Sequence, residues 1–141
     1  MLIVEQRRVV AEALARAFDR AGLTVAGTAL TANAALPLAH ALRPDVVVID
    51  HHVLDRGAPH LIGTIRTLDP EVQVVVVGGG PTRDEMVRAL QAGAVGYLLD
   101  VDSADRLIEA VKHAAGGEMV IRTDVLAEIV RERETEGRPA G

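Results

Sequence analysis

Five short apolar runs alternate with segments of helical periodicity, and this alternation restricts the fold more than any other feature of the chain. The runs are Leu2–Val4, Leu23–Ala26, Val46–Ile49, Val72–Val77 and Val95–Leu99. They are rich in β-branched residues and mostly continuous, which is typical of strands covered on both faces. Strands that alternate with helices form a parallel sheet with right-handed crossovers. The sequence therefore predicts an α/β fold, a three-layer sandwich around a five-stranded parallel sheet.

Two local signals make specific predictions about the intervening helices. Thr82-Arg83-Asp84-Glu85 has the pattern of a capping box and predicts the start of the fourth helix. Pro37 falls inside the second helical segment, 32–42, where it removes a backbone donor. We therefore expect the second helix to be bent or to start late.

Length and composition restrict the function. The chain has 141 residues, the size of one domain, and contains no cysteine, which excludes disulfides, thiolate metal sites and thiol nucleophiles. Its net charge is −5 and Phe18 and Tyr97 are its only aromatic residues, so neither a basic face nor a stacking platform for nucleic acid is expected. No apolar run is long enough to span a bilayer, and because the sequence from Met1 shows no basic region before the first strand we expect no signal peptide. We expect a cytoplasmic protein without direct nucleic-acid or membrane contact.

Asp50 follows directly on the third apolar run. A carboxylate in this position lies at the carboxyl edge of the sheet, where open α/β folds bind their ligands. Asp50, His51, His52, Asp55 and His60 could suggest a metal cluster, but solvated loop histidines are the favoured interpretation, with His52 a possible partner of Asp50. Because the chain lacks a Ser-His-Asp or nucleotide-binding signature, we expect no enzyme.

In the order of its elements and in its local sequence, the chain resembles the receiver domain of bacterial two-component response regulators, from Met1 to about Gly117. Leu2–Gln6 resembles the first strand with its acidic pair, and Leu42–Asp50 the third strand that ends in the phosphoacceptor. Ala92–Leu99 resembles the turn and fifth strand of that family. The pattern is most similar to the subfamily whose C-terminal half is a helix-turn-helix DNA-binding domain. The resemblance implies a flavodoxin-like sheet of order 2-1-3-4-5.

The resemblance also assigns roles to single residues, and most of them depart from the family pattern. Asp50 matches the phosphoacceptor position and Tyr97 the switch aromatic. The acidic pair that holds a divalent cation is Glu5 and Gln6 here, so a magnesium site formed by Glu5 and Asp50 is weakened although not excluded. The other two switch positions are also changed. Gly78 replaces the hydroxyl residue after the fourth strand.

Asp100 replaces the lysine that closes the fifth strand in the family. An acyl phosphate carries about two negative charges, which Asp100 would repel where the lysine would attract them. Arg7 or Arg8, at the start of the first helix, could fold over the edge and neutralise Asp50. These departures favour a receiver that phosphorylation does not switch.

The sequence thus predicts a receiver domain over 1–117, a short helical extension over 118–130 and a linker or disordered tail over 131–141. The predicted function is regulatory: a phosphorylation-independent receiver that controls dimerisation of an attached DNA-binding domain. Two alternatives stay open. One is an ordinary phosphoacceptor that uses Asp50, and the other is a domain that senses a small molecule. The sequence names no sensor kinase and no ligand.

Overall fold

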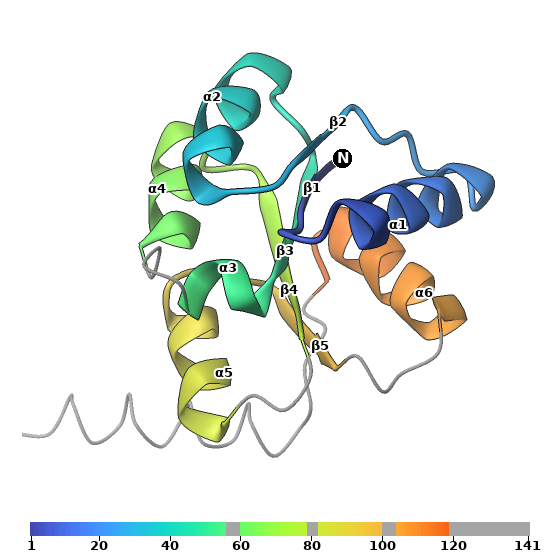
Figure 1. Cartoon of the computed structure of the whole chain (residues 1–141). Coiled ribbons are helices and arrows are strands. Elements are labelled where there is room, and N and C mark those ends of the chain that lie inside the picture. The colour runs from blue at the N-terminus through green and yellow to red at the C-terminus, as the bar shows by residue number, and fades with distance from the viewer. Residues whose placement is uncertain (56–59, 79–81, 100–103, 119–141) are drawn as a thin grey trace, which may run out of the picture.

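The computed structural model describes residues 1–55, 60–78, 82–99 and 104–118, which form a five-stranded sheet (Figure 1). The strand order is β2-β1-β3-β4-β5 and every neighbouring pair is parallel, as predicted. The strands are β1 (Leu2–Val4), β2 (Gly27–Ala29), β3 (Val46–Asp50), β4 (Gln73–Gly78) and β5 (Gly96–Leu99). The helices are α1 (Arg8–Arg20), α2 (Ala32–Leu42), α3 (His51–Asp55), α4 (Leu61–Leu68), α5 (Arg83–Gln91) and α6 (Ala104–Ala115).

The helices cover both faces of the sheet and so make the three predicted layers. α1 and α6 lie on one side, and α2, α4 and α5 lie on the other (Figure 1). Successive strand residues point to opposite faces, so Val47 and Ile49 pack in the cluster under α2 and α4, whereas Val46 and Val48 pack against α1 and α6. Both faces of β3 are therefore apolar, which explains why its sequence shows no alternation.

The second strand lies later than predicted. The apolar run Leu23–Ala26 leads into the strand rather than forming it, and β2 begins at Gly27, which pairs with Leu2. Leu23 and Val25 are nevertheless partly buried against the α1 and α6 cluster. Their apolar character reflects this packing of a connecting segment, and the pattern alone did not distinguish it from strand pairing.

The second helix does not start late. Thr31 caps it, with Oγ1 accepting a hydrogen bond from the backbone N–H of Ala34 at 3.1 Å, so the helix begins at Ala32. Pro37 lies inside the helix on an exposed position. The cap fixes the first turn well before the proline, which is why the predicted delay does not occur.

Several expectations concern residues that the structure does not describe. The tail over 131–141 and all but the first residue of the extension over 118–130 belong to this group, as does Asp100. In the part of the chain that is described, no helix is both long enough and apolar enough to cross a membrane.

Candidate functional site

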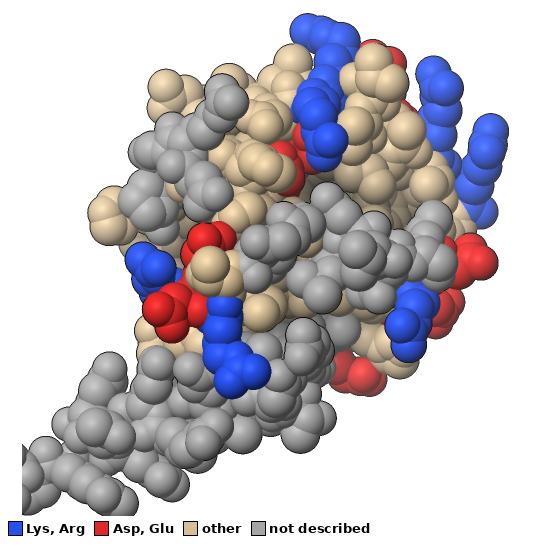
Figure 2. All heavy atoms as spheres, turned by 60° about the horizontal axis from the view of Figure 1, so that its bottom comes forward, with Lys and Arg blue, Asp and Glu red and all other residues tan. Residues whose placement is uncertain are grey.

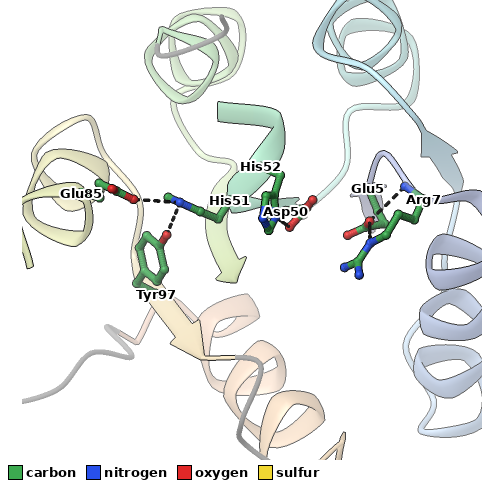
Figure 3. Close-up of polar contacts among 7 residues, drawn as sticks. All are labelled: Glu5, Arg7, Asp50, His51, His52, Glu85 and Tyr97. Atoms are coloured by element: carbon green, nitrogen blue, oxygen red, sulfur yellow. Dashed lines mark hydrogen bonds and ion pairs between the residues drawn. The ribbon is translucent and has the colours of Figure 1, made fainter. Parts of the chain in front are cut away.

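Two buried carboxylates lie at the carboxyl edge of the sheet. Asp50 is the last residue of β3 and is 5% exposed, and Glu5 follows β1 and is 4% exposed. Because β1 and β3 are neighbours in the sheet, these side chains come to the same edge (Figure 3). This is the position that the sequence predicts for both.

The described surface around this end of the molecule carries both acidic and basic side chains (Figure 2).

Arg7 pairs with Glu5. Oε1 of Glu5 accepts hydrogen bonds from the backbone N–H of Arg7 at 3.0 Å and from its Nε at 2.9 Å. A buried carboxylate needs such partners because burial removes its hydration. Arg7 thus stabilises the charge at β1, while its predicted role, or that of Arg8, as the neutralising partner of Asp50 stays a prediction.

His52 is a partner of Asp50. Its Nδ1 lies 3.3 Å from Oδ1 of Asp50, and its side chain is 48% exposed. The other oxygen, Oδ2, is buried and accepts no hydrogen bond within the described residues. The interpretation of His52 as a partner of Asp50 agrees with this contact. As far as the described residues show, Asp50 therefore keeps one oxygen that an incoming group could engage.

The described residues offer a magnesium ion few ligands. Mg²⁺ is held by oxygen ligands in octahedral geometry, usually with one or two carboxylates. Glu5 and Asp50 are the two candidates, and one oxygen of Glu5 is already occupied by Arg7. No group of three or more His, Asp or Glu side chains within the described ranges could hold a metal.

His51 is buried, which corrects its interpretation as a solvated loop histidine. It opens α3, is 7% exposed, and points away from Asp50 toward β5 and α5 (Figure 3). Its Nδ1 lies 2.5 Å from the hydroxyl of Tyr97, and its Nε2 lies 2.8 Å from Oε2 of Glu85. Nδ1 can accept a hydrogen bond from the tyrosine hydroxyl when Nε2 carries the ring proton, whereas the contact with Glu85 is a short distance without good hydrogen-bond geometry. We call these three residues the clamp.

The clamp holds Tyr97 in the interior. Tyr97 is 6% exposed, and its ring lies next to that of His51 with the centroids 5.9 Å apart. Glu85 was predicted to complete a capping box at the start of α5. Thr82 does cap this helix, with Oγ1 accepting from the backbone N–H of Glu85 at 3.2 Å, but the carboxylate of Glu85 faces His51.

Gly78 and His51 are sterically coupled. A Cβ atom added to Gly78 would lie 2.4 Å from Cβ of His51 and 3.2 Å from its Cγ, and the first distance is far below van der Waals contact. No residue with a side chain, serine and threonine included, fits at position 78 while His51 stays in place. A glycine within an otherwise valine-rich strand marks a close approach by another group. That signal could have drawn attention to His51 from the sequence.

Three further residues were predicted to lie near the site: Asp100, Asp55 and His60. Asp100 lies outside the described residues, so its repulsion of a phosphoryl group stays an expectation. Asp55 ends α3, and His60 is exposed directly before α4. Within the described part of the chain, the structure thus brings together Glu5 with Arg7, Asp50 with His52, and His51 with Tyr97 and Glu85.

Comparisons with known proteins identify the family of the chain. The family model described as response regulator receiver domain matches residues 1–112. The uncharacterized transcriptional regulatory protein YxjL of Bacillus subtilis is 31% identical over 110 residues, which are 78% of this chain and 50% of that protein. The nitrate/nitrite response regulator protein NarL of Escherichia coli K12 is 31% identical over 112 residues, 77% of this chain and 52% of that one. The chain thus spans about half the length of these relatives.

Solved structures of response regulators superimpose on this chain. A LuxR-family two-component response regulator from Aurantimonas sp. SI85-9A1 superimposes with a TM-score of 0.81 at 25% identity, over 94% of this chain and 96% of that one. The signal receiver domain of the putative response regulator NarL from Mycobacterium tuberculosis superimposes with a TM-score of 0.76 at 25% identity, over 83% and 95%.

Proposed function

Because the chain belongs to the response regulator receiver family, we propose that it is an atypical receiver whose output does not depend on phosphorylation of Asp50. The observation that carries this proposal is the clamp. The resemblance implies a signal path in which a hydroxyl after the fourth strand moves and the aromatic residue on the fifth strand turns inward. Here position 78 has no hydroxyl, and Tyr97 is already buried against His51.

The clamp supports a single state of Tyr97. Its hydroxyl pairs with His51, and His51 lies against Glu85, so turning Tyr97 outward would break a hydrogen bond to a buried histidine. Losing such a hydrogen bond costs about 0.5–1.5 kcal/mol. A phosphoryl group on Asp50 would have no hydroxyl at position 78 through which to compensate this cost.

We further propose that the domain acts within a longer transcriptional regulator. The two relatives described above are a transcriptional regulatory protein and a response regulator, each about twice as long as the matched region. In this proposal, residues 1–117 form the receiver, 118–130 a helical extension and 131–141 a linker to a helix-turn-helix domain. The receiver has no catalytic role of its own. It controls the pairing of two copies, and the attached domain contacts DNA.

The alternative is an ordinary phosphoacceptor, and one observation favours it. Oδ2 of Asp50 is buried without a hydrogen bond from the described residues, so an oxygen is available where the family accepts phosphate. Phosphorylation of Asp50 would then occur despite the changed switch positions, and a sensor kinase would be the partner that supplies it.

Intact-mass measurement separates the two functions. The protein is incubated with acetyl phosphate and magnesium, alongside the Asp50→Asn variant. The proposal predicts no stoichiometric phosphoryl adduct on folded protein. A stoichiometric adduct that the variant lacks would establish Asp50 as a working acceptor and would favour the alternative.

A further inference from the structure

A cavity of about 250 Å³ lies beside the clamp, and all three clamp residues line it. Its apolar walls come from three helices: Leu54 of α3, Ile62 of α4, and Ala89 of α5, with Ala92 directly after α5. Asp50 and Glu5 do not line it. The cavity is thus a separate site from the carboxylate edge, in contact with the switch aromatic.

One polar atom of this cavity lacks a well-formed hydrogen bond. Oε2 of Glu85 is buried and accepts no hydrogen bond of good geometry within the described residues, although Nε2 of His51 lies 2.8 Å away. A buried acceptor without a well-placed donor is destabilising. A molecule in the cavity that offers a donor to this oxygen would remove that defect.

We propose that the cavity binds a small apolar molecule that carries a hydrogen-bond donor, such as an aliphatic amine, and that the donor pairs with the carboxylate of Glu85. The volume lies slightly below the range of about 300–1,000 Å³ for drug-sized ligands, so the ligand is small. The apolar walls take its body. The combination of apolar walls and few polar groups is typical of ligand sites.

The charges around the cavity favour a donor over an anion. Arg88 also lines the cavity, but it is exposed, and water and salt screen its charge. Oε2 of Glu85 is buried, although the side chain as a whole is 30% exposed, so its interaction with a charged ligand is screened less than that of Arg88. An anionic ligand would meet this carboxylate, whereas an amine would pair with it.

This inference extends the proposed function, because it supplies an input for a receiver that does not respond to phosphate. A donor that binds Oε2 of Glu85 competes with Nε2 of His51 for the same oxygen. Ligand binding would therefore change the contacts that hold Tyr97. The coupling runs through two adjacent contacts and does not involve Asp50.

Tyr97 provides a specific reporter for the test. It is the only tyrosine, and the chain has no tryptophan, so tyrosine emission reports on a single residue that lines the cavity. We use cyclohexylamine as the probe and cyclohexanecarboxylate as its matched anion, since neither absorbs at the excitation wavelength. We expect a saturable change in emission with cyclohexylamine, at a dissociation constant on the order of 1 mM, and affinity about tenfold weaker or none for the carboxylate.

Variants locate the site. Glu85→Gln keeps the size of the side chain and removes its charge, and we expect about tenfold weaker binding of the amine. Glu12→Gln removes an exposed glutamate on α1, on the other side of the sheet, and should leave binding unchanged. Ala89→Leu fills the cavity and should abolish binding. If Ala89→Leu does not fold, the comparison of Glu85→Gln with Glu12→Gln still shows whether the amine binds at Glu85.

Two results would overturn the inference: no saturable change in Tyr97 emission, or equal affinity of the unmodified protein and Glu85→Gln for the amine. The titrations contain no phosphodonor. A phosphoryl adduct on Asp50 would therefore refute the proposed function without affecting this test, and a failed titration would leave the proposed function standing.

Discussion

His51 lies so close to Gly78 that the two residues are sterically coupled, and the free energy of unfolding of single and double variants measures this coupling. Gly78→Ala forces a Cβ to within 2.4 Å of Cβ of His51. We expect the free energy of unfolding to fall by about 1–3 kcal/mol, the usual cost of overpacking a core. In the His51→Ala background the same change should be neutral or slightly stabilising, because alanine is favoured over glycine within a strand by about 0.5–1 kcal/mol.

Gly63→Ala is the matched control for this experiment. Gly63 lies inside α4, and a Cβ there would meet nothing within 4 Å. We expect an increase in stability of about 0.5–1 kcal/mol. Urea denaturation of the four variants and the unmodified protein gives the coupling energy. Purely additive effects of Gly78→Ala and His51→Ala would contradict the steric account.

The sequence was sufficient for some of these residues and insufficient for others. Asp50 and Glu5 end or follow apolar strands, so local pattern places them at the sheet edge. His51 depends on a partner, Tyr97, that lies 46 positions away in the chain. Nothing local to His51 predicts its burial, and the nearby His52, which is half exposed, shows that residue type alone does not decide.

At the scale of elements, α5 determines whether the clamp can form, because it carries Glu85. Its cap is Thr82, whose Oγ1 accepts from the backbone N–H of Glu85. We expect Thr82→Ala to lower the free energy of unfolding by about 1 kcal/mol, and Thr82→Ser to have little effect. Chemical denaturation of both variants tests this. Equal losses in the two would show that the hydroxyl is not the stabilising group.

The elements were more predictable than the site. Four of the five strands follow from apolar runs, β2 being the exception, and the strand order follows from the resemblance to the receiver family. The error at β2 arose because Leu23 and Val25 are partly buried in a connecting segment. The expectation of a late start for α2 was wrong because the cap at Thr31 determines where the helix begins, whatever Pro37 does later. Burial and pairing produce the same apolar pattern, and only the tertiary structure separates them.

At the scale of the whole molecule, the proposal concerns pairing of two copies. We expect the chain to show a concentration-dependent mass in sedimentation experiments, and acetyl phosphate with magnesium to leave this dependence unchanged. The physical reason is that Tyr97 is already in its buried position before any phosphate is added. A dimer that forms only with the phosphodonor, and not in Asp50→Asn, would contradict this prediction.

The net charge of −5 leads to a second prediction at this scale. DNA binding relies on basic groups that neutralise phosphates. We expect the chain alone to show no salt-sensitive increase in the anisotropy of labelled duplex DNA. Binding that weakens steeply as salt is raised would place DNA contacts within this chain and would contradict the proposed division of roles.

The central claim is that the clamp holds Tyr97 inward whatever the state of Asp50. The most direct measurement is the nuclear magnetic resonance spectrum of the Tyr97 ring, recorded with and without acetyl phosphate and magnesium. The account predicts the same ring resonances in both conditions, and a change when His51→Ala removes the clamp. Ring resonances that move with the phosphodonor in the unmodified protein, and stay fixed in Asp50→Asn, would contradict it.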